Sequence, residues 1–205
     1  LKIEKLLSRD LGGGNFSWTG KIIGSESSTL SFTRIDHEIV GGLKPSFGAN
    51  QRFITHEGKV IWFKAKKRNH LACGGCLMDQ KQKNLDPRPG RRIKNWRDGD
   101  GNLIDLLVAY TADAKLSQNL STESQVEAYL QNAISESNLC FLNSKVNAAI
   151  RLVHLVEIDY AETQDPSLDL NRSTNPSDGY LDQLHTLRDQ YGADLVTVLI
   201  SQGDG

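Results

Sequence analysis

The residues most able to carry out chemistry in this 205-residue sequence are two cysteines separated by two glycines, Cys73 and Cys76. A C-x-x-C pair can form a tight disulfide, supply half of a metal site or remain as two free thiols. The sequence has three cysteines, so there is no second C-x-x-C to complete a closed structural zinc site. The preferred interpretation is a disulfide or an inert thiol pair. A thiol-redox protein built on Cys73 and Cys76 is an alternative, although the pair does not begin a helix in a β-α-β unit.

The histidines do not form a zinc-binding motif. A helix-borne zinc site needs two histidines four residues apart, so that both imidazoles project from one face, with a glutamate between them as general base. No two of the five histidines have this spacing: His37, His56, His70, His154 and His185. His37 and Glu38 begin like the motif, but position 41 is Gly41 and the surrounding pattern is that of a strand. A nucleophile elbow, a phosphate loop and a dinucleotide fingerprint are also missing, so the sequence shows no self-contained catalytic site.

The composition indicates a soluble globular protein. Hydrophobic residues make up 38 % of the sequence and charged residues 24 %, with a net charge of −1. This balance gives no reason to expect a nucleic acid or a membrane surface as partner. No apolar run approaches the roughly 20 residues that span a bilayer. The sequence begins with Leu1 and stops just after a predicted strand, so we expect it to be a piece of a longer protein.

Three short apolar runs in the second half predict buried strands, at residues 103–110, 149–158 and 195–200. Apolar runs of this length are typical of a parallel sheet that is covered on both faces. Helical patterns at residues 122–141 and 178–191 separate the runs. Because parallel strands need crossover connections, the second half is predicted to be a β-α-β-α-β unit.

Local signals refine these helices. Thr122 can cap the first helix with Gln125 as its reciprocal partner, and Gly192 can end the second helix. A helical turn is expected at residues 168–172, inside the loop that precedes the second helix.

Three side chains with possible chemistry receive structural interpretations. Cys140 is expected to be a buried small side chain on the apolar face of the first helix. His154 is expected to be a hydrogen-bonded core residue, on the strand face that also holds four apolar residues, Ile150, Leu152, Val156 and Ile158. His185 is expected to be structural or exposed beside the apolar stripe of the second helix.

The first half carries strand signals. Predicted strands lie at residues 15–24, 29–34, 38–43, 51–55 and 59–66. Residues 35–37 and 56–58 are predicted hairpin turns, so the expected architecture is a small antiparallel meander or barrel. Residues 1–7 fit either a strand or a short helix.

Residues 79–102 differ from both halves, because they are polar and contain proline and glycine. Between Lys81 and Arg97 there are seven lysines and arginines against a single acidic residue, Asp86. Such a stretch predicts an exposed linker, where proteases commonly cut. Arg91 and Arg92 would suit a processing enzyme that recognises basic residues, and an ordinary solvated linker is the simpler interpretation.

Six segments of the second half occur in a characteristic order: IDLLVAYT (104–111), VEA (126–128), AISESN (133–138), IRLVH (150–154), DGYLD (178–182) and LRDQYGADLV (187–196). Together they resemble the start of the catalytic domain of reprolysin-like, metzincin-type zinc metallopeptidases of the secreted bacterial kind. The resemblance covers about residues 102–205. The pro-region that precedes such domains is more weakly resembled by two segments of the first half, SWTGK (17–21) and VGG (40–42).

The resemblance implies an α+β precursor with three parts. Residues 1–78 would form an antiparallel, β-rich pro-region-like domain, residues 79–102 a basic linker, and residues 103–205 the N-terminal part of a zincin-like catalytic domain with a mostly parallel sheet. In such precursors the pro-region is removed, which makes Arg91 and Arg92 a candidate processing site. A pro-region thiolate can also occupy the catalytic zinc, and Cys73 or Cys76 is a candidate for that role.

The family's metal motif, H-E-x-x-H-x-x-G-x-x-H, does not occur in the sequence and would lie beyond Gly205. The resemblance implies that the full-length protein is a secreted or cell-envelope zinc metalloendopeptidase that acts on proteins or peptides. The 205-residue chain itself is expected to hold no catalytic zinc and to be inactive. A non-catalytic binding or inhibitory module on a zincin-like fold is the alternative.

Overall fold

The computed structural model describes residues 2–25, 28–64, 102–163 and 165–201, and these residues form an α+β protein with two sheets. The predicted combination of an antiparallel first half and a parallel second half is confirmed. Among the described residues, no helix combines the length and apolar character needed to cross a bilayer.

The first half is a six-stranded antiparallel meander in which each strand pairs with the next along the chain. Its strands are β1 (Ile3–Gly12), β2 (Asn15–Ile22), β3 (Thr29–Ile35), β4 (Glu38–Lys44), β5 (Gln51–His56) and β6 (Lys59–Lys64). Residues 3–7, part of the segment that fitted either a strand or a short helix, therefore lie in strand β1. The predicted turns at residues 35–37 and 56–58 are present, and Asp36 and Glu57 adopt the positive φ angles that tight hairpins require.

One row of residues crosses five strands of this sheet in register: Trp18, Phe32, Gly41, Phe53 and Trp62. The ring centroids of Trp18 and Phe32 are 5.4 Å apart, and those of Phe53 and Trp62 are 4.4 Å apart. Gly41 leaves the space in the middle of the row into which the Phe53 ring extends. The aromatic row therefore depends on a residue without a side chain at this position.

Replacing Gly41 by alanine should destabilise the sheet. A Cβ atom at this position would lie 2.3 Å from Phe53 Cζ and 2.5 Å from the carbonyl oxygen of Ser31. Since the second neighbour is backbone and cannot rotate away, we expect a loss of about 2 kcal/mol, as in overpacked cores. Thermal unfolding should show a decrease in Tm of about 4–8 °C. Gly42→Ala is the control, because a Cβ there meets only Gln51 O, at 3.4 Å; equal losses in both variants would contradict this explanation.

The second half contains a three-stranded parallel sheet in the order β8-β7-β9. The strands are β7 (Asn102–Tyr110), β8 (Ala148–Glu157) and β9 (Leu195–Leu199). The first connection contains α1 (Ala112–Ser117) and α2 (Glu123–Asn143), and the second contains α3 (Pro166–Thr174) and α4 (Gln183–Tyr191). The sequence did not predict α1, and the expected helical turn at residues 168–172 is part of the longer helix α3.

The predicted start of the first helix and the predicted end of the second are confirmed, whereas α4 begins at Gln183 and not at residue 178. Thr122 caps α2 by accepting a hydrogen bond from Gln125 N, and Gly192 ends α4 in the left-handed conformation. The reciprocal bond differs from the prediction, because Gln125 Oε1 accepts from the backbone N–H of Ser121.

Two predictions about side chains are wrong. Cys140 is exposed, because it is rotated about 100° around α2 from the buried residue Leu139. The single face expected for β8 is interrupted by a bulge at Val153, since Leu106 pairs with Leu152 and the next residue, Leu107, pairs with His154. The extra residue moves the side chains that follow to the opposite face.

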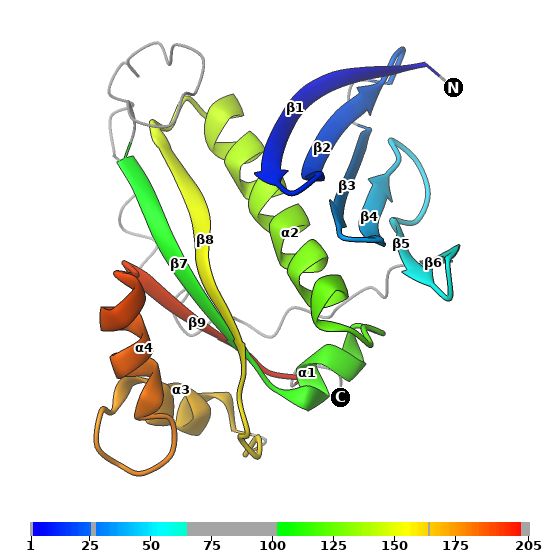
Figure 1. Cartoon of the computed structure of the whole chain (residues 1–205). Coiled ribbons are helices and arrows are strands. Elements are labelled where there is room, and N and C mark those ends of the chain that lie inside the picture. The colour runs from blue at the N-terminus through cyan, green and yellow to red at the C-terminus, as the bar shows by residue number, and fades with distance from the viewer. Residues whose placement is uncertain (1, 26–27, 65–101, 164, 202–205) are drawn as a thin grey trace.

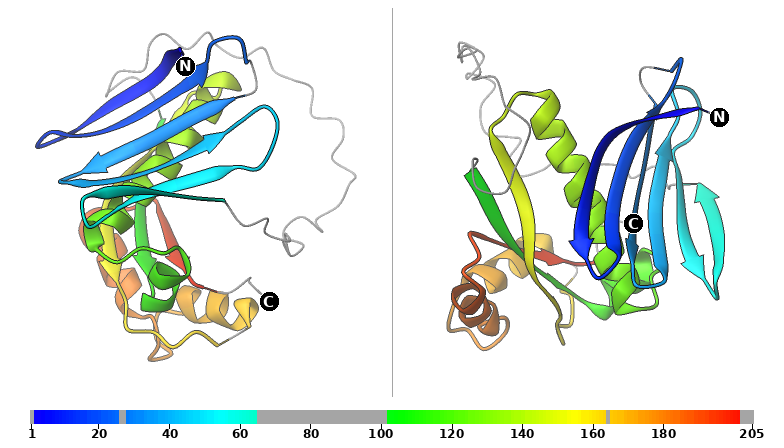
Figure 2. Two further views of the ribbon diagram at one scale, coloured as in Figure 1. Left: turned by 90° about the vertical axis from the view of Figure 1, so that its right-hand side faces the viewer. Right: turned by 45° about the horizontal axis from the view of Figure 1, so that its top comes forward.

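The elements form four layers, with α2 between the two sheets and α4 on the far face of the parallel sheet (Figures 1 and 2). One cluster of buried apolar residues joins the six-stranded sheet, α2 and the parallel sheet, and includes Ile35, Val40, Ile54, Val108 and Val126. A second cluster lies between the parallel sheet and the segment that leads into α4: Ala109, Ile158, Leu181 and Leu184. The two halves of the chain therefore share a core.

Candidate functional site

Helix α2 is the element through which the two halves contact each other, and its two faces differ. Asn138 marks the face toward the parallel sheet, where its side chain donates to Ile150 O (2.9 Å) and accepts from Ile150 N (2.8 Å). Ile134, Leu130 and Val126 precede Asn138 in steps of four residues, so this face is mostly apolar. The face toward the six-stranded sheet is instead rich in polar side chains.

The six-stranded sheet meets α2 with four small hydroxyl residues, Ser17, Thr19, Ser31 and Thr33, which we call the hydroxyl seam. Each of them is at most 1 % exposed. They form two cross-strand pairs between β2 and β3, Ser17 with Thr33 and Thr19 with Ser31. A buried sheet face is usually apolar, so this seam must find its partners on the helix.

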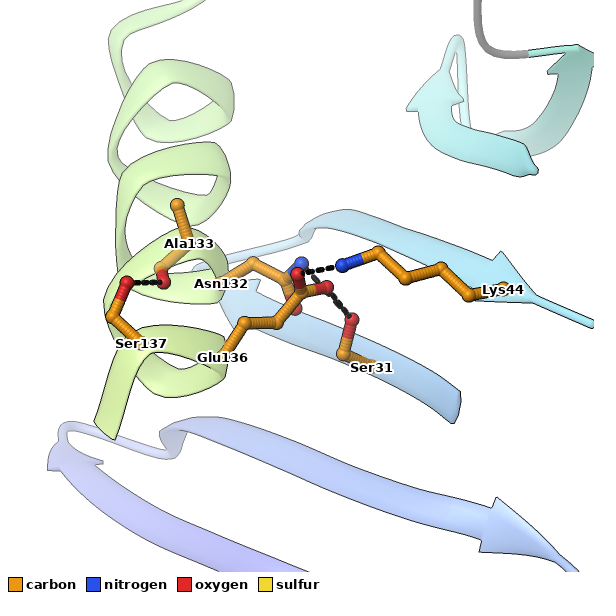
Figure 3. Close-up of polar contacts among 6 residues, drawn as sticks. All are labelled: Ser31, Lys44, Asn132, Ala133, Glu136 and Ser137. Carbon is orange, nitrogen blue, oxygen red and sulfur yellow. Dashed lines mark hydrogen bonds and ion pairs between the residues drawn. The ribbon is translucent and has the colours of Figure 1, made fainter. Parts of the chain in front are cut away.

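The helix supplies partners for two of the four, Ser17 and Ser31. Ser135 Oγ donates to Ser17 Oγ at 2.8 Å, and Asn132 Nδ2 donates to Ser31 Oγ at 3.2 Å. Ser31 Oγ in turn donates to Glu136 Oε1 at 2.5 Å. The other carboxylate oxygen of Glu136 pairs with Lys44 Nζ (Figure 3). Hydrogen bonds and one ion pair therefore carry much of this contact.

Gln125 makes a second polar connection nearer the N-terminus of α2. Its side chain is 2 % exposed. Gln125 Nε2 donates to Thr55 O at 2.6 Å and to Glu38 Oε2 at 3.0 Å, while Oε1 accepts from Ser121 N at 2.8 Å. One side chain thus joins two strands of the sheet to the start of the helix.

Gln125→Ala should weaken the attachment of the sheet to α2. The substitution leaves the Thr55 carbonyl, the Glu38 carboxylate and the Ser121 N–H without these partners. Buried polar groups that lose a partner cost about 1–3 kcal/mol, so we expect a loss of about 2–4 kcal/mol in chemical denaturation. Gln131→Ala is a matched control, because Gln131 is a half-buried glutamine on the same helix. A loss of similar size in the control would contradict the role of Gln125.

Three carboxylates approach one another where the turn between β3 and β4 meets α2. Ser124 Oγ donates to Asp36 Oδ2 at 2.9 Å, which brings that turn next to the first turns of the helix. Burial raises the pKa of Glu127, and the negative charges of Asp36 and Glu123 raise it further. Glu38 adds a fourth carboxylate on the adjacent strand, held by Gln125. The contact is therefore less favourable when Glu127 is ionised.

This arrangement predicts that the contribution of Glu127 to stability decreases as the pH rises. Because the pKa of Glu127 is higher in the folded than in the unfolded state, its contribution is fully present below its ordinary value of 4.5 and disappears as the pH rises through the folded value. Glu127→Gln should remove this part of the pH dependence. Melting temperatures measured from acid to neutral pH will test it, with the exposed Glu57→Gln as control. Parallel curves for wild type and Glu127→Gln would contradict the prediction.

The carboxyl ends of the parallel strands form another polar cluster, centred on Glu162. Its Oε1 accepts from Thr111 Oγ1 (2.5 Å) and Ser201 N (2.8 Å), and its Oε2 accepts from Ser201 Oγ (2.5 Å). These bonds tie the ends of β7 and β9 to the segment that follows β8. Burial, with the charges of Glu157 and Glu123, raises the pKa of the neighbouring Tyr110 to about 12.

The residues singled out from the sequence do not gather into one site. Cys73, Cys76, Arg91 and Arg92 lie outside the described residues. His37 and His56 are exposed at hairpin turns of the sheet.

The other two histidines of the described chain lie on the α4 side of the parallel sheet. His154 is half-buried and stacks on Tyr191 of α4, with the rings 3.8 Å apart and 9° from parallel. His185 is half-buried, and its Nε2 lacks a hydrogen-bond partner among the described residues.

Within the described ranges, no three His, Cys, Asp or Glu side chains come together as metal ligands. The described residues therefore do not fit a catalytic zinc, and no chemical step can be assigned to a metal held by them.

Sequence reasoning missed the polar contacts between the sheet and α2. The capping pattern identified Thr122 and Gln125 as the start of a helix but gave no sign that Gln125 also reaches the sheet. Ser17 and Ser31 alternate with aromatic residues along β2 and β3, which was a usable signal for two different sheet faces. Glu162 lies in a loop without periodicity, so only the fold reveals its contacts.

Comparison with known proteins identifies the family that the second half of the chain resembles. The family described as metallo-peptidase family M12B, reprolysin-like, matches residues 102–205. A peptidyl-Asp metalloendopeptidase of Stenotrophomonas maltophilia (strain R551-3) is 35 % identical over 89 residues, which cover 40 % of this chain and 21 % of that protein. One of Xanthomonas campestris pv. campestris is 33 % identical over 103 residues, covering 50 % and 24 %. One of Pseudomonas aeruginosa is 31 % identical over 97 residues, covering 47 % and 15 %.

The chain thus matches less than a quarter of the length of each of these relatives. The family match starts at Asn102, the first residue of β7, and includes α2 and the cluster around Glu162. Since it covers half of the sequence, the chain belongs to the reprolysin-like metallopeptidases of family M12B.

Proposed function

We propose that these 205 residues are the precursor part of a zinc-dependent metalloendopeptidase. Residues 1–78 serve as a pro-region, residues 79–102 as a linker, and residues 103–205 as the N-terminal part of a zincin-like catalytic domain of β-α-β-α-β type. The observation that carries the proposal is the position of the family boundary. The match begins at β7, and the preceding strands fold as a separate antiparallel sheet that packs on α2 of the matched part.

The polar groups at the contact between the six-stranded sheet and α2 support a pro-region that can dissociate. Thr19 Oγ1, Thr33 Oγ1 and Asn132 Oδ1 are buried and have no hydrogen-bond partner among the described residues. Buried polar groups without partners lower the stability of the docked state and regain hydrogen bonds to water on separation. The hydroxyl seam therefore favours dissociation more than an apolar contact of the same size would.

Cleavage in the linker would separate the two parts of the chain covalently. Arg91 and Arg92 are the proposed processing site. Cys73 or Cys76 is proposed as an inhibitory thiolate in the precursor, since a thiolate is a strong ligand for zinc. The catalytic metal ligands themselves would come from residues outside this sequence, so the 205 residues alone would be inactive.

The substrates are proposed to be proteins or peptides that contain aspartate, because the relatives named above are peptidyl-Asp metalloendopeptidases. A secreted or cell-envelope location suits such an enzyme.

The test is expression of the complete gene product and, separately, of the 205 residues. The complete protein should hydrolyse casein and Asp-containing peptides, lose activity with a chelator and regain it with zinc, while the 205-residue chain stays inactive. Activity that is insensitive to chelators would overturn the metallopeptidase proposal. Absence of activity from the processed complete protein would favour the non-catalytic binding or inhibitory module.

The processing site is tested by determining the N-terminus of the mature protein. Cleavage beside Arg91 and Arg92 should be lost in the double variant Arg91→Ala, Arg92→Ala and retained in Lys81→Ala, Lys83→Ala. A mature N-terminus at Asp98 or Asp100 would instead indicate that an Asp-directed peptidase processes the chain.

A further inference from the structure

The six-stranded sheet has one face that the described elements leave uncovered. Helix α2 packs on the face that carries the hydroxyl seam. Because side chains alternate between the two faces of a strand, the aromatic row that includes Trp18, Phe32, Phe53 and Trp62 lies on the opposite face, which we call the outer face. The outer face lies on the outside of the molecule and is turned toward the viewer in the left view of Figure 2.

The centre of the outer face is apolar and partly accessible. In the aromatic row, Trp62 is 51 % exposed and Trp18 is half-buried. Leu30 and Leu43, which pair across β3 and β4, lie on one side of this row, and Val60, 48 % exposed, lies on the other. Contiguous exposed apolar surface of more than a few hundred Å² is rare on monomeric proteins and marks interaction sites.

The charged residues that the strands place on the outer face lie at its border. Lys5 and Asp10 are on the edge strand β1, Lys64 ends the edge strand β6, and Arg34 precedes the turn after β3. The aromatic row itself contains no charged residue. An apolar centre inside a charged border is the usual anatomy of an interface between proteins.

The dimensions of the outer face match those of a dimer interface. Six strands that are about 4.8 Å apart span about 24 Å, which decides the width of the face. Its strands have six to ten residues, so they are about 20–34 Å long and the face covers roughly 500–800 Å². Stable interfaces bury about 600–1,000 Å² on each partner. The outer face is therefore large enough to hold two chains together.

A second copy of the same sheet is the occupant that fits this surface. Two twisted sheets pack face to face with their strand directions within about 30° of each other, and their side chains interdigitate. Two copies have the same twist, and each offers its apolar centre to the other. A single helix, about 10 Å in diameter, would cover less than half of the width of about 24 Å.

We propose that the outer face is a homodimer interface, in which the six-stranded sheets of two chains pack face to face across a twofold axis. Such a contact is closed after two chains, so it does not lead to longer assemblies. Because α2 packs on the opposite face, dimer formation leaves the contact between the two halves of each chain unchanged. The proposal does not depend on whether the whole protein is a peptidase.

The test is sedimentation equilibrium of the 205-residue chain over a range of micromolar concentrations. The wild type should show a reversible equilibrium between one and two chains. Val60→Glu should weaken the dimer about a hundredfold, because the twofold axis buries the new carboxylate twice. Val60→Lys should have the same effect, since a buried charge of either sign is unfavourable. Circular dichroism will verify that both variants keep their fold.

Ile61→Glu is the matched control, because Ile61 is the next residue on the same strand, is 45 % exposed and lies on the opposite face. It should leave the dimer unchanged. The dimer should also persist in about 1 M NaCl, which screens charges but does not weaken apolar burial. The proposal is overturned if the chain is monomeric at every concentration, if Val60→Glu and Ile61→Glu weaken association equally, or if the salt dissociates the dimer.

Discussion

Burial of α2 on two opposite sides is the constraint on which the rest of this structure depends. The helix packs an apolar face on the parallel sheet and a largely polar face on the six-stranded sheet, with Asn138 and Gln125 fixing one contact on each side. One apolar cluster continues past the helix and includes Ile35 from one sheet and Val108 from the other. The family match starts at residue 102, and the apolar core contains residues from both sides of that position.

The polar part of this contact bears on the proposal that the first half is a separable pro-region. An apolar sheet face would dock strongly but would leave an insoluble surface on both partners after separation. The hydroxyl seam docks through hydrogen bonds instead, and Ser17 and Ser31 can exchange their partners for water. The aromatic row through Phe32 and Phe53 lies on the other face of the sheet, while Ile35, Val40 and Ile54 give the docked face an apolar part beside the seam. The docked face is thus partly polar and partly apolar, and the polar part is compatible with the proposed separation.

The sequence predicted the elements whose patterns are local and strong. Three apolar runs identified the parallel strands, and Thr122 and Gly192 identified helix ends, because propensity and burial agree at these places. Features that depend on packing were not predictable. Helix α1 has six residues and no full apolar repeat. The bulge at Val153 changes the face of His154 without any signal in the residue types. The contacts of Gln125 connect residues that are distant in sequence, so single-sequence periodicity could not reveal them.

The positions of the buried polar groups also distinguish structural from catalytic roles within the proposed peptidase. The described residues place their buried polar side chains at contacts between elements, as Glu162 does at the ends of β7 and β9, and no three potential metal ligands gather among them. A carboxylate that accepts three hydrogen bonds is committed to holding strand ends together and has little capacity left for a substrate. Under the proposed function, the ligands of a catalytic metal would come from outside the described residues. Under the proposed function, the described part supplies the parallel sheet beside which such a site can form, and α2 packs on that sheet.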